Sequence, residues 1–434
     1  MTDHPAACRT APLSFQQEET VRNIRQYPDC VLRYDAVRLY RLDGRVDVDC
    51  LVGAVEDLVD RHAALRTVLA AEGDGYVQRI HPGPVAPVTV ARRPGVTPED
   101  VGRLLMEARY TPDQVLAGAP LFRPAIHQLD DTVLLSFLVH HLVYDGWSLP
   151  VLFRDVSLLY RARLTGEPTG LPELPESYAD FAEAQRTIWR ERGQQAVAFY
   201  RPRLADCPKT VKWPMPLHPP AVSSPRAIAS IPFSLDQGVS GTVRKVARSA
   251  RVSPFLVLLC AVAVAVFRVT GERNLLFAPD NANRAEPHRW DTVGHYVNSK
   301  LVRVQVEQGQ RFADLLRSVW SDWLAADAHQ DVYVDQILQE LGGPRPIKVN
   351  MFNYPVGDHE TPQLPNVDIS TVRESTVSGE GERRDWRDFT VFWEELDRTY
   401  HGVVLYRPAH VDLMAAEGVV DHVRQVCAQP DAVV

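Results

Sequence analysis

The chain has 434 residues, of which 45% are hydrophobic and 24% are charged, an average composition for a globular protein and a length that suits two or three domains. Its formal net charge of -8 at pH 7, without any lysine- or arginine-rich run, argues against nucleic acid as a partner. The six cysteines show no Cys-x-x-Cys or cysteine–histidine spacing, which argues against a zinc site and a disulfide framework and fits a reducing cytoplasm.

The N-terminus and the longest apolar run both argue against a membrane protein. Met1 to Thr10 has no basic region followed by an apolar core, so no signal peptide is predicted. The stretch Pro254 to Phe267 is too short to span a membrane and is typical of a buried core helix. We therefore expect a soluble, cytoplasmic protein that has no membrane partner.

The first part of the chain alternates between strand and helix patterns. Cys30 to Leu42 predicts a strand, and Val48 to Val59 has the apolar spacing of an amphipathic helix. Val133 to Val139 is a continuous apolar run, typical of a strand buried on both faces, and Leu149 to Leu164 again has helical spacing. The sequence therefore predicts a buried strand, a short loop and a helix in that order.

The second part repeats this mixed pattern after two proline-rich connections, at 166–175 and 208–225. The predicted elements are a helix at Tyr178 to Arg203, a strand at Ile231 to Leu235, a helix at Asp236 to Arg251, a buried helix capped by Ser253 and ending near Val269, and strands at Asn274 to Ala278, Val302 to Val306, Lys348 to Asn353 and His401 to Tyr406. Val372 to Arg387 has several glycines and no periodicity, and predicts an exposed loop or hairpin arm.

One motif carries the chemistry. Residues 140–146 have the sequence HHLVYDG, which is the pattern HHxxxDG, and they lie directly after the predicted buried strand and before a helix. Four fixed positions that include two histidines match by accident in a chain of this length only about once in a thousand cases. A lone histidine is more often a core residue, but this combination in this place predicts a functional site.

His141 is the predicted catalytic residue. A histidine of near-neutral pKa at the mouth of a buried strand can accept a proton from an amine or hydroxyl, or can align that group for attack. Adjacent side chains of a strand face opposite sides, so if His141 points into a cleft, His140 should point away and serve packing or ring orientation.

Asp145 and Gly146 each have two interpretations. Asp145 can cap backbone groups or pair with an arginine and so fix the loop, a structural role that we favour over direct proton transfer. The Gly146 N–H can face a substrate carbonyl, or the glycine can simply permit a tight turn. The chain has no GxSxG elbow and no cysteine beside a histidine, which favours direct transfer from a preactivated donor over an acyl-enzyme.

With this motif, the chain resembles the condensation domains of nonribosomal peptide synthetases over nearly its whole length. The segment HHLVYDGWS, which ends with Trp147 and Ser148, is close to that family's HHxxxDGWS form. The other matching segments, in chain order, are Leu13 to Gln17 (S-x-A/F-Q), Arg61 to Thr67 (R-H-x-x-L-R-T), Tyr178 to Gln185 (Y-x-D-[YF]-A-x-x-Q), Ala282 to Arg284 (alanine-glycine-arginine), Val293 to Ser299 (I-G-x-F-V-N-T), His329 to Val332 (HQDVP) and Val349 to Asn353 (a late M-F strand). Ala63, Asn283 and Tyr333 depart from the usual glutamate, glycine and proline.

The resemblance implies an α/β fold of two lobes that form a pseudo-dimer like chloramphenicol acetyltransferase, with an active-site tunnel between the lobes. The lobes would be residues 1–175, which carry the histidine motif, and residues 176–434, which carry a floor loop near 280–291 and a latch around 372–387. The aspartate of the motif would pair with Arg284. The residues expected along the substrate tunnel are Tyr296, Asn298, Met351 and Asn353.

The resemblance also implies an activity. A condensation enzyme of this kind transfers an aminoacyl or other acyl group from a carrier-protein phosphopantetheine thioester to an amine or a hydroxyl, and the sequence leaves amide and ester products equally open. Phosphopantetheine arrives with the carrier, and no metal or cofactor of the chain's own is expected. Free-standing relatives decorate natural products, including enediyne-type cores.

The partners follow from what the sequence lacks. It contains no adenylation module and no carrier-protein serine motif, so we expect a free-standing enzyme that meets a discrete peptidyl carrier protein in trans and uses a small-molecule or carrier-bound acceptor. A domain excised from a larger synthetase is the alternative, which the initial Met1 and the intact family start make less favoured.

Rival functions share parts of the motif. Epimerization domains also carry HHxxxDG, although Trp147 and Ser148 favour condensation. A catalytically silent domain that recruits proteins to a carrier is a second rival, and the intact motif argues against it. His140 and His141 exclude cyclization domains, which carry aspartates there, and acyltransferases of the broader fold usually show a single HxxxDG.

Overall fold

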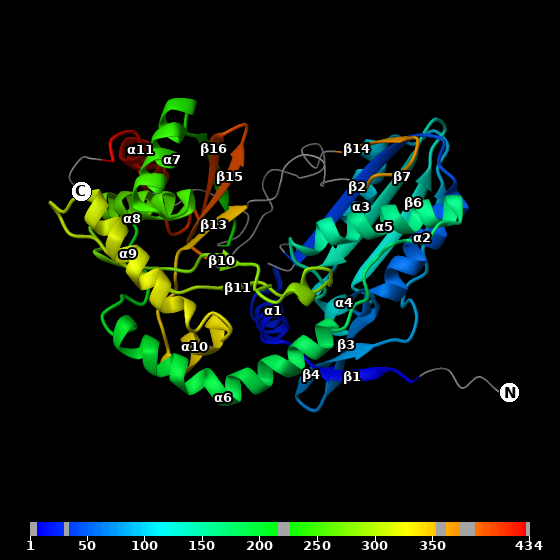
Figure 1. Ribbon diagram of the computed structural model, residues 1–434, viewed down its shortest axis with the longest axis horizontal. Coiled ribbons are helices and arrows are strands. Elements are labelled where there is room, and N and C mark those ends of the chain that lie inside the picture. The colour runs from blue at the N-terminus through cyan, green and yellow to red at the C-terminus, as the bar shows by residue number, and fades with distance from the viewer. Residues whose placement is uncertain (1–6, 30–33, 216–225, 353–361, 373–386, 431–434) are drawn as a thin grey trace. The chain divides into compact units, whose positions relative to one another are not determined.

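A computed structural model gives the fold of the chain and describes residues 7–29, 34–215, 226–352, 362–372 and 387–430 (Figure 1). Asn353 and nearly all of the expected latch at 372–387 lie outside these residues. The chain divides into two compact units, and neither is continuous in sequence. The first unit comprises Met1–Thr187, Arg284–Val297 and Pro355–Glu380, and the second comprises Ile188–Asn283, Asn298–Tyr354 and Gly381–Val434.

These units differ from the continuous lobes 1–175 and 176–434, whose boundary remains a prediction. Two segments from the second half of the sequence belong to the first unit because they bond to it directly. Strand β14 (Val367–Thr371) pairs antiparallel with β2 (Asp35–Gly44). Arg284 and the backbone of Tyr296 both bond to Asp145 of the histidine motif.

The main sheet of the first unit positions the motif. Its strand order is β14-β2-β7-β6-β5, with β7 at Val133–His140, β6 at Phe122–Gln128 and β5 at Thr89–Arg92. The pairs are antiparallel except β5 with β6. The central strand β7 is buried from Leu134 onward, as its continuous apolar run predicts, and ends at His140 opposite Asp35 of β2.

A smaller sheet and several helices complete the first unit. The sheet has the order β1-β4-β3 and is antiparallel. Its strands and the helices of this unit are β1 (Arg9–Pro12), β4 (Gly75–Ile80), β3 (Thr67–Glu72), α1 (Phe15–Gln26), α2 (Val48–Arg61), α3 (Pro98–Glu107), α4 (Pro112–Leu116), α5 (Ser148–Thr165) and the 3-10 turns Ala63–Arg66 and Pro287–Arg289. Ser14 begins α1 with a capping box shared with Gln17, and α2 packs against α5.

Helix α6 (Tyr178–Leu204) starts in the first unit and continues into the second. The main sheet of the second unit has the order β13-β15-β16-β8, in which only β13 and β15 are parallel. The elements of this unit are β8 (Ala229–Ser234), α7 (Gln237–Ala250), α8 (Pro254–Thr270), β9 (Asn274–Phe277), β10 (Asp280–Asn281), β11 (Asn298–Ser299), β12 (Val302–Gln305), α9 (Phe312–Asp327), α10 (Val334–Leu341), β13 (Lys348–Phe352), β15 (Phe389–Leu396), β16 (Thr399–Tyr406) and α11 (Leu413–Ala428).

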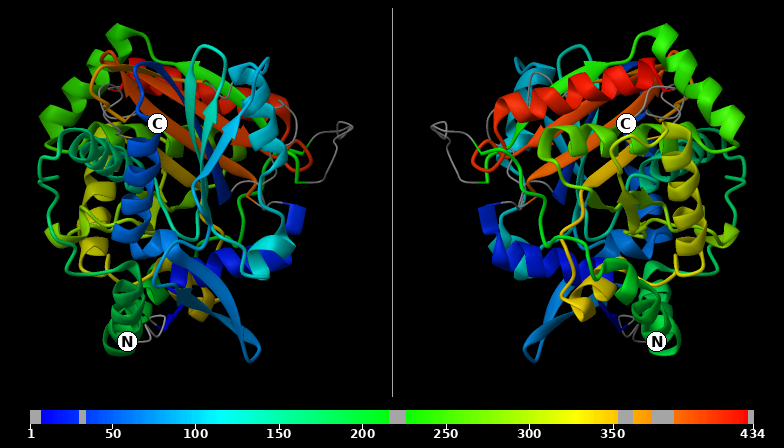
Figure 2. Two further views of the ribbon diagram at one scale, coloured as in Figure 1. Left: turned by 90° about the vertical axis from the view of Figure 1, so that its right-hand side faces the viewer. Right: turned by 90° about the vertical axis from the view of Figure 1, so that its left-hand side faces the viewer.

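Helix α8 forms the centre of the second core. Ser253 caps it by accepting a hydrogen bond from the Leu256 N–H, and every residue from Leu256 to Val266 is buried. Gly271 ends the helix in a left-handed conformation, with φ of 71°, which glycine adopts without steric cost. Helix α11 packs on α8 and contacts β16, and Figure 2 shows α11 in red along the orange strands.

The predicted elements are confirmed to within a few residues at their ends, and the mixed α/β composition is as expected. The predicted strand at 30–42 begins at Asp35 among the described residues. The sequence did not predict the elements β1, α1, β3 to β6, α3, α4, β10, β11, α9, α10, β14, β15 and α11, several of which are short or partly exposed.

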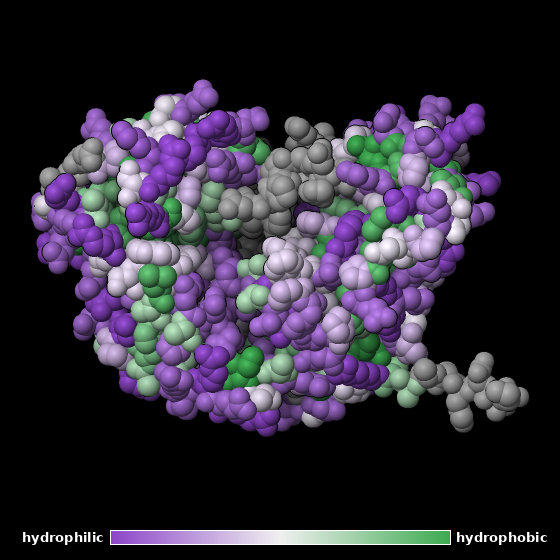
Figure 3. All heavy atoms as spheres, in the orientation of Figure 1, coloured by the Kyte–Doolittle hydropathy of each residue, from purple (hydrophilic) through white to green (hydrophobic). Residues whose placement is uncertain are grey.

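In the part of the chain that the structure describes, no single helix is long and apolar enough to cross a membrane; α7 and α8 meet that test only as a pair, bent by 109° at their break. Figure 3 shows mostly hydrophilic side chains on the face that it presents, with hydrophobic ones in scattered patches.

Candidate active site

The histidine motif forms a turn between β7 and α5. The His141 N–H donates to the Tyr34 carbonyl, and the Val143 N–H donates to the His140 carbonyl at 3.0 Å. Leu142 and Val143 are completely buried, so the turn is anchored by apolar packing as well as by hydrogen bonds. This local structure fixes the backbone positions from which the two histidine side chains project.

His140 has the environment of a packing residue. Its side chain is completely buried, its Nδ1 accepts a hydrogen bond from the Leu142 N–H at 3.2 Å, and its ring meets the Tyr110 ring edge to face at 5.3 Å. Burial, together with the charges of His141 and Arg123, lowers the pKa of His140 to about 3. The ring is therefore uncharged at neutral pH.

His141 is more accessible than His140, being only half-buried. Two aromatic rings contact its imidazole. The Tyr144 ring centroid lies 5.0 Å away at an interplanar angle of 36°, and the His295 centroid lies 4.3 Å away at 56°. Of the two adjacent histidines, His141 therefore has the position in which a proton could be exchanged with a substrate.

Asp145 is completely buried, and structural hydrogen bonds occupy both of its carboxylate oxygens. Arg284 Nη2 lies 3.0 Å from Oδ1 and 3.3 Å from Oδ2. Ser148 donates to Oδ1 from its hydroxyl at 2.8 Å and from its N–H at 2.9 Å, while the Tyr296 N–H donates to Oδ2 at 3.0 Å. The pair with Arg284 that the resemblance implied is present, and this geometry favours the structural role of Asp145 over proton transfer.

Arg284 extends this support to the loop that follows it. Its Nη1 donates to the Thr292 carbonyl at 2.7 Å and to the Arg289 carbonyl, and its guanidinium lies 4.2 Å from the centroid of the Tyr296 ring. The side chain of Arg284 is 1% exposed. One buried cation therefore joins the motif to the segment 284–297.

The remaining motif residues have different surroundings. Ser148 Oγ also lies 3.2 Å from the Gly294 nitrogen, from which it accepts a hydrogen bond. Trp147 is 40% exposed, and its indole N–H donates to the Trp290 carbonyl at 3.0 Å. The Gly146 carbonyl accepts a hydrogen bond from the Leu149 N–H, and both interpretations of the Gly146 N–H stay predictions.

Two of the expected tunnel residues are buried and make structural contacts. Tyr296 is 0% exposed, and its ring packs against the rings of Tyr178 and Phe181. Asn298 is 2% exposed, and its amide binds the backbone of four residues. These contacts reach the carbonyls of Gln330 and Val332 and the N–H groups of Ser299 and Val334. Because these contacts use the whole amide, they favour a structural role for Asn298, and tunnel-lining roles for Asn298 and Tyr296 stay predictions.

Met351 is half-buried and packs against the core of the second unit, so a tunnel-lining role for it stays a prediction. Asn353 lies outside the described residues.

The sequence did not single out His295, although its ring contacts that of His141. It occupies the variable position of the segment VGHYVNS, which the family pattern leaves open. Burial, with the repulsion that protonated His141 and His140 would exert, lowers its pKa well below the usual histidine value. The preceding Gly294 is required by space, since a Cβ there would lie 2.4 Å from the ring of Tyr178. A histidine at the variable position of a segment that matches the family pattern was the signal that could have found it.

A cysteine does lie beside a histidine in space, contrary to the inference from sequence neighbours. Cys8 Sγ is 3.6 Å from His81 Nδ1, because the antiparallel register of β1 and β4 pairs Arg9 with Ile80. Among the described residues no group of three or more His, Cys, Asp and Glu side chains is arranged to hold a metal ion.

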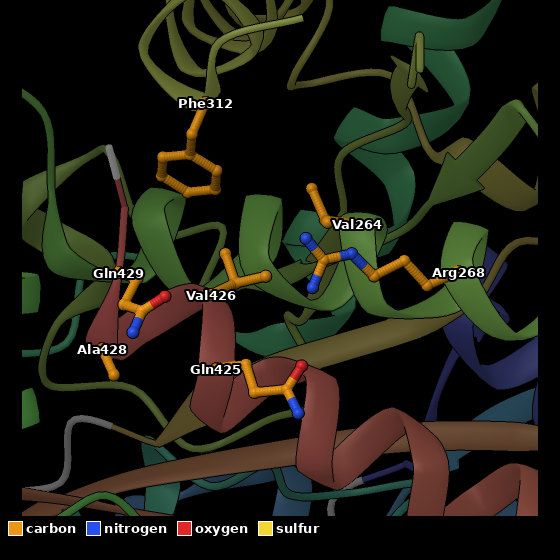
Figure 4. Close-up of a pocket in the computed structure, with 7 residues that line it drawn as sticks. All are labelled: Val264, Arg268, Phe312, Gln425, Val426, Ala428 and Gln429. Atoms are coloured by element: carbon orange, nitrogen blue, oxygen red, sulfur yellow. The ribbon is translucent and has the colours of Figure 1, made fainter. Parts of the chain in front are cut away.

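The second unit contains an open pocket of about 500 Å³ between α8, α9 and α11 (Figure 4). Its lining residues are Val264, Arg268, Phe312, Gln425, Val426, Ala428 and Gln429. None of these belongs to the histidine motif or to the segment 284–297.

The family model of the condensation domain matches residues 9–425. The chain belongs to the condensation domain family. Phosphinothricin tripeptide synthetase PhsC of Streptomyces viridochromogenes is 32% identical over 323 residues, which cover 73% of this chain and 30% of PhsC. The chain thus spans less than a third of the length of that curated relative, and smaller shares of the cyclosporin synthetase of Tolypocladium inflatum and the chondramide synthase of Chondromyces crocatus.

Solved structures show the same fold over the full length. The X-domain from teicoplanin biosynthesis has a TM-score of 0.82 at 22% identity, covering 100% of this chain and 98% of that one. SgcC5 of Streptomyces globisporus, solved with (R)-(-)-1-(2-naphthyl)-1,2-ethanediol and sucrose, has a TM-score of 0.72 at 24% identity, covering 98% of this chain and 100% of that one. The predicted fold class, a two-lobed α/β fold, is confirmed, and the tunnel between the lobes stays a prediction.

Proposed function

We propose that the chain is a condensation enzyme that transfers an aminoacyl or other acyl group from a carrier-protein phosphopantetheine thioester to an amine or hydroxyl of an acceptor. The observation that carries this proposal is the contrast between the two histidines. His140 is completely buried, whereas His141 is half-buried, and its ring is contacted by those of Tyr144 and His295. This contrast supports His141, rather than His140, as the residue that handles the substrate proton.

The proposed reaction has two steps. The acceptor nitrogen or oxygen attacks the thioester carbonyl carbon while His141 takes its proton, which gives a tetrahedral intermediate. The C–S bond then breaks, the carbonyl re-forms, and the phosphopantetheine sulfur takes the proton from the His141 imidazolium. The products are the amide or ester and the free thiol of the carrier, so no metal or redox partner enters the balance.

Asp145, Arg284 and Ser148 act on this reaction through geometry. They bind one another and the backbone of Gly294 and Tyr296, and so hold the turn that carries His141 next to the segment that carries His295. Since effective acid–base catalysis needs the base within hydrogen-bond reach of the proton, this support affects rate without contact with substrate.

The carrier is proposed to be a discrete peptidyl carrier protein that meets the chain in trans. Hydroxyl acceptors belong in the first assay beside amines. SgcC5 was solved with a diol, and one relative of the chain is beauvericin nonribosomal cyclodepsipeptide synthetase.

The test is incubation of an acyl-loaded carrier with panels of amines and alcohols, followed by mass spectrometry of the product and of the carrier. We expect the wild-type chain to form an amide or ester and His141→Ala to lose about 10²- to 10⁴-fold in rate. His422→Ala, at a partly exposed position on α11, is the matched control.

Other outcomes would favour the rivals. Wild-type rates from His141→Ala would overturn the mechanism. An inverted stereocentre on the carrier without any acceptor would indicate an epimerization domain. Carrier binding without any turnover would indicate a silent recruiting domain.

A further inference from the structure

Three polar groups hold the backbone around His295 in place. Ser148 Oγ accepts a hydrogen bond from the Gly294 N–H, and Asp145 Oδ2 accepts one from the Tyr296 N–H. The Tyr178 hydroxyl donates to the His295 carbonyl at 2.7 Å. The residues before and after His295 and its own carbonyl are therefore fixed, and its ring is held 4.3 Å from that of His141, centroid to centroid.

The His295 ring is a neutral polar group with unused hydrogen-bonding capacity. Its Nδ1 is buried and has no hydrogen-bond partner within the described part of the chain. Burial beside His141 and His140 lowers the pKa of His295 well below its usual value, and the buried charges of Arg284 and Asp145 are paired with each other. Buried polar atoms are nearly always paired in native proteins, so an unpaired one next to a catalytic group indicates a ligand that completes it.

Among the described residues, Arg284 Nε and His140 Nε2 are also buried without a hydrogen-bond partner, but Ser148 Oγ and the terminal nitrogens of Arg284 are engaged. Ser148 Oγ bonds to Asp145 and Gly294, and the terminal nitrogens of Arg284 bond to Asp145 and to the carbonyls of Arg289 and Thr292. A neutral imidazole, in contrast, carries one N–H donor. The ring contact with His141 places the His295 imidazole beside the proposed base.

We propose that His295 is a second catalytic residue of this site, which donates a hydrogen bond to the thioester carbonyl oxygen as that oxygen becomes negatively charged. This inference rests on the proposed function. The attacking atom, held by His141, approaches the carbonyl carbon to about 3–3.5 Å, which brings the carbonyl oxygen within reach of a ring in contact with His141. During attack the C=O π pair moves onto oxygen, where the His295 N–H binds it.

His295 returns to its starting state in each turnover. When the C–S bond breaks, the pair on oxygen re-forms the carbonyl, the sulfur takes the proton from His141, and the His295 hydrogen bond is released. An uncharged imidazole suits this task because it donates a hydrogen bond without giving up its proton to the intermediate. Removal of one such donor typically lowers kcat by about 10²- to 10³-fold.

The first test compares two substitutions that keep a side chain of similar size. His295→Phe keeps a ring against His141 but has no donor, and His295→Gln keeps an N–H donor without the ring. We expect kcat to fall about 100-fold in His295→Phe with little change in KM for the loaded carrier, and to recover about 10-fold in His295→Gln. His401→Phe, at an exposed position of β16, is the control and should match the wild type.

The second test measures binding, so that it does not depend on turnover. The probes are carrier proteins whose phosphopantetheine bears a trifluoromethyl ketone, which hydrates to mimic the intermediate, or an amide in place of the thioester. We expect His295→Phe to weaken binding of the ketone carrier about 100-fold and that of the amide carrier less than threefold. Equal weakening of both carriers, or wild-type kcat in His295→Phe, would overturn the inference.

Failure of folding and failure of the proposed function stay distinguishable from failure of this inference. If thermal denaturation shows that His295→Phe does not fold, His295→Leu and His295→Gln are compared in the same two assays, and equal kcat in these two variants would overturn the inference. If the wild-type chain itself transfers no acyl group to any acceptor, the proposed function fails. If it does transfer and the His295 variants match it, only the inference fails.

Discussion

Arg284 Nη2 lies 3.0 Å from Asp145 Oδ1, and the two side chains are 1% and 0% exposed. A buried charge whose partner is removed is strongly destabilising, because neither water nor a counter-ion replaces the partner. We predict that Arg284→Met lowers the free energy of unfolding by about 3–5 kcal/mol. Asp145→Asn combined with Arg284→Met should cost less than the sum of the two single changes. Chemical denaturation of all four proteins checks this, and strictly additive effects would contradict a direct pairing.

Ser148 joins the motif to Gly294, and its loss should affect rate more than stability. Ser148→Ala leaves the Gly294 N–H unpaired, which costs about 1–3 kcal/mol, and releases the backbone next to His295. We predict a fall in kcat of about 10-fold or more with a retained fold, because small displacements of catalytic groups cost large factors in rate. The matched control is Thr165→Ala at the exposed end of the same helix, α5, which should retain wild-type kcat. Equal kcat in the two variants would show that this clamp does not govern the rate.

The strands and helices that sequence predicted were those whose pattern is strong and local. The apolar composition of β7 and of helix α8 was enough to predict both elements, and the histidine motif was correctly predicted to lie at the end of β7. In contrast, the pairing of β14 with β2 joins opposite ends of the chain and leaves no local signal. Long-range pairing of this kind is why the two units are discontinuous.

The candidate site was predicted unevenly for a similar reason. The family pattern brought Asp145 and Arg284 together correctly, because each stands at a fixed position of a motif. The pattern did not indicate which way side chains face, so Tyr296 and Asn298 were expected along the tunnel although both are buried. His295 stands at a position that the pattern leaves variable, and only three-dimensional contact with His141 revealed it.

Asn298 is predicted to stabilise the second unit rather than to bind substrate. Its amide donates to two carbonyls and accepts from two N–H groups, and three of these four partners lie within residues 329–334. Asn298→Ala removes all four hydrogen bonds, and we expect a loss of about 2–4 kcal/mol in unfolding free energy. Asn298→Asp keeps the acceptor oxygen and loses the donors. In Asn298→Asp the Val334 N–H should stay more protected from hydrogen exchange than in Asn298→Ala. Equal protection in the two variants would argue against a structural role for Asn298.

The chain should lose stability at mildly acidic pH because of buried neutral histidines. Burial lowers the pKa of His127 to about 4 and that of His140 to about 3. The pKa of a histidine in the unfolded chain is about 6.5, so between pH 6.5 and these lower values the unfolded chain binds more protons than the folded chain. The stability that the neutral histidines contribute is therefore complete above about pH 6.5 and is lost as the pH falls. We predict that the thermal midpoint decreases from pH 6.5 to pH 4.5.

A substitution isolates the contribution of one histidine. His127 Nε2 lies 3.0 Å from Ser136 Oγ, and its Nδ1 accepts a hydrogen bond from Arg93, so His127→Gln keeps a polar group there without the titration. We expect this variant to have a lower thermal midpoint than the wild type at pH 7. Its free energy of unfolding should fall less steeply as the pH falls, with a slope that differs from that of the wild type by at most about 1.4 kcal/mol per pH unit. His422→Gln, at a partly exposed position, should keep the wild-type slope. If the free energy of unfolding of His127→Gln depends on pH as steeply as that of the wild type, titration of His127 does not contribute to the loss of stability in acid.

The membership of Arg284–Val297 in the first unit has a consequence for engineering by exchange of parts. A chimera that joins residues 1–187 of this chain to the remainder of a relative would receive a foreign segment opposite Asp145, Ser148 and His141. The buried carboxylate of Asp145 would then depend on whatever arginine and backbone geometry that relative supplies. The site is therefore built from two separated stretches of sequence, residues 1–187 and Arg284–Val297. Hybrids should be functional only when both stretches come from the same parent.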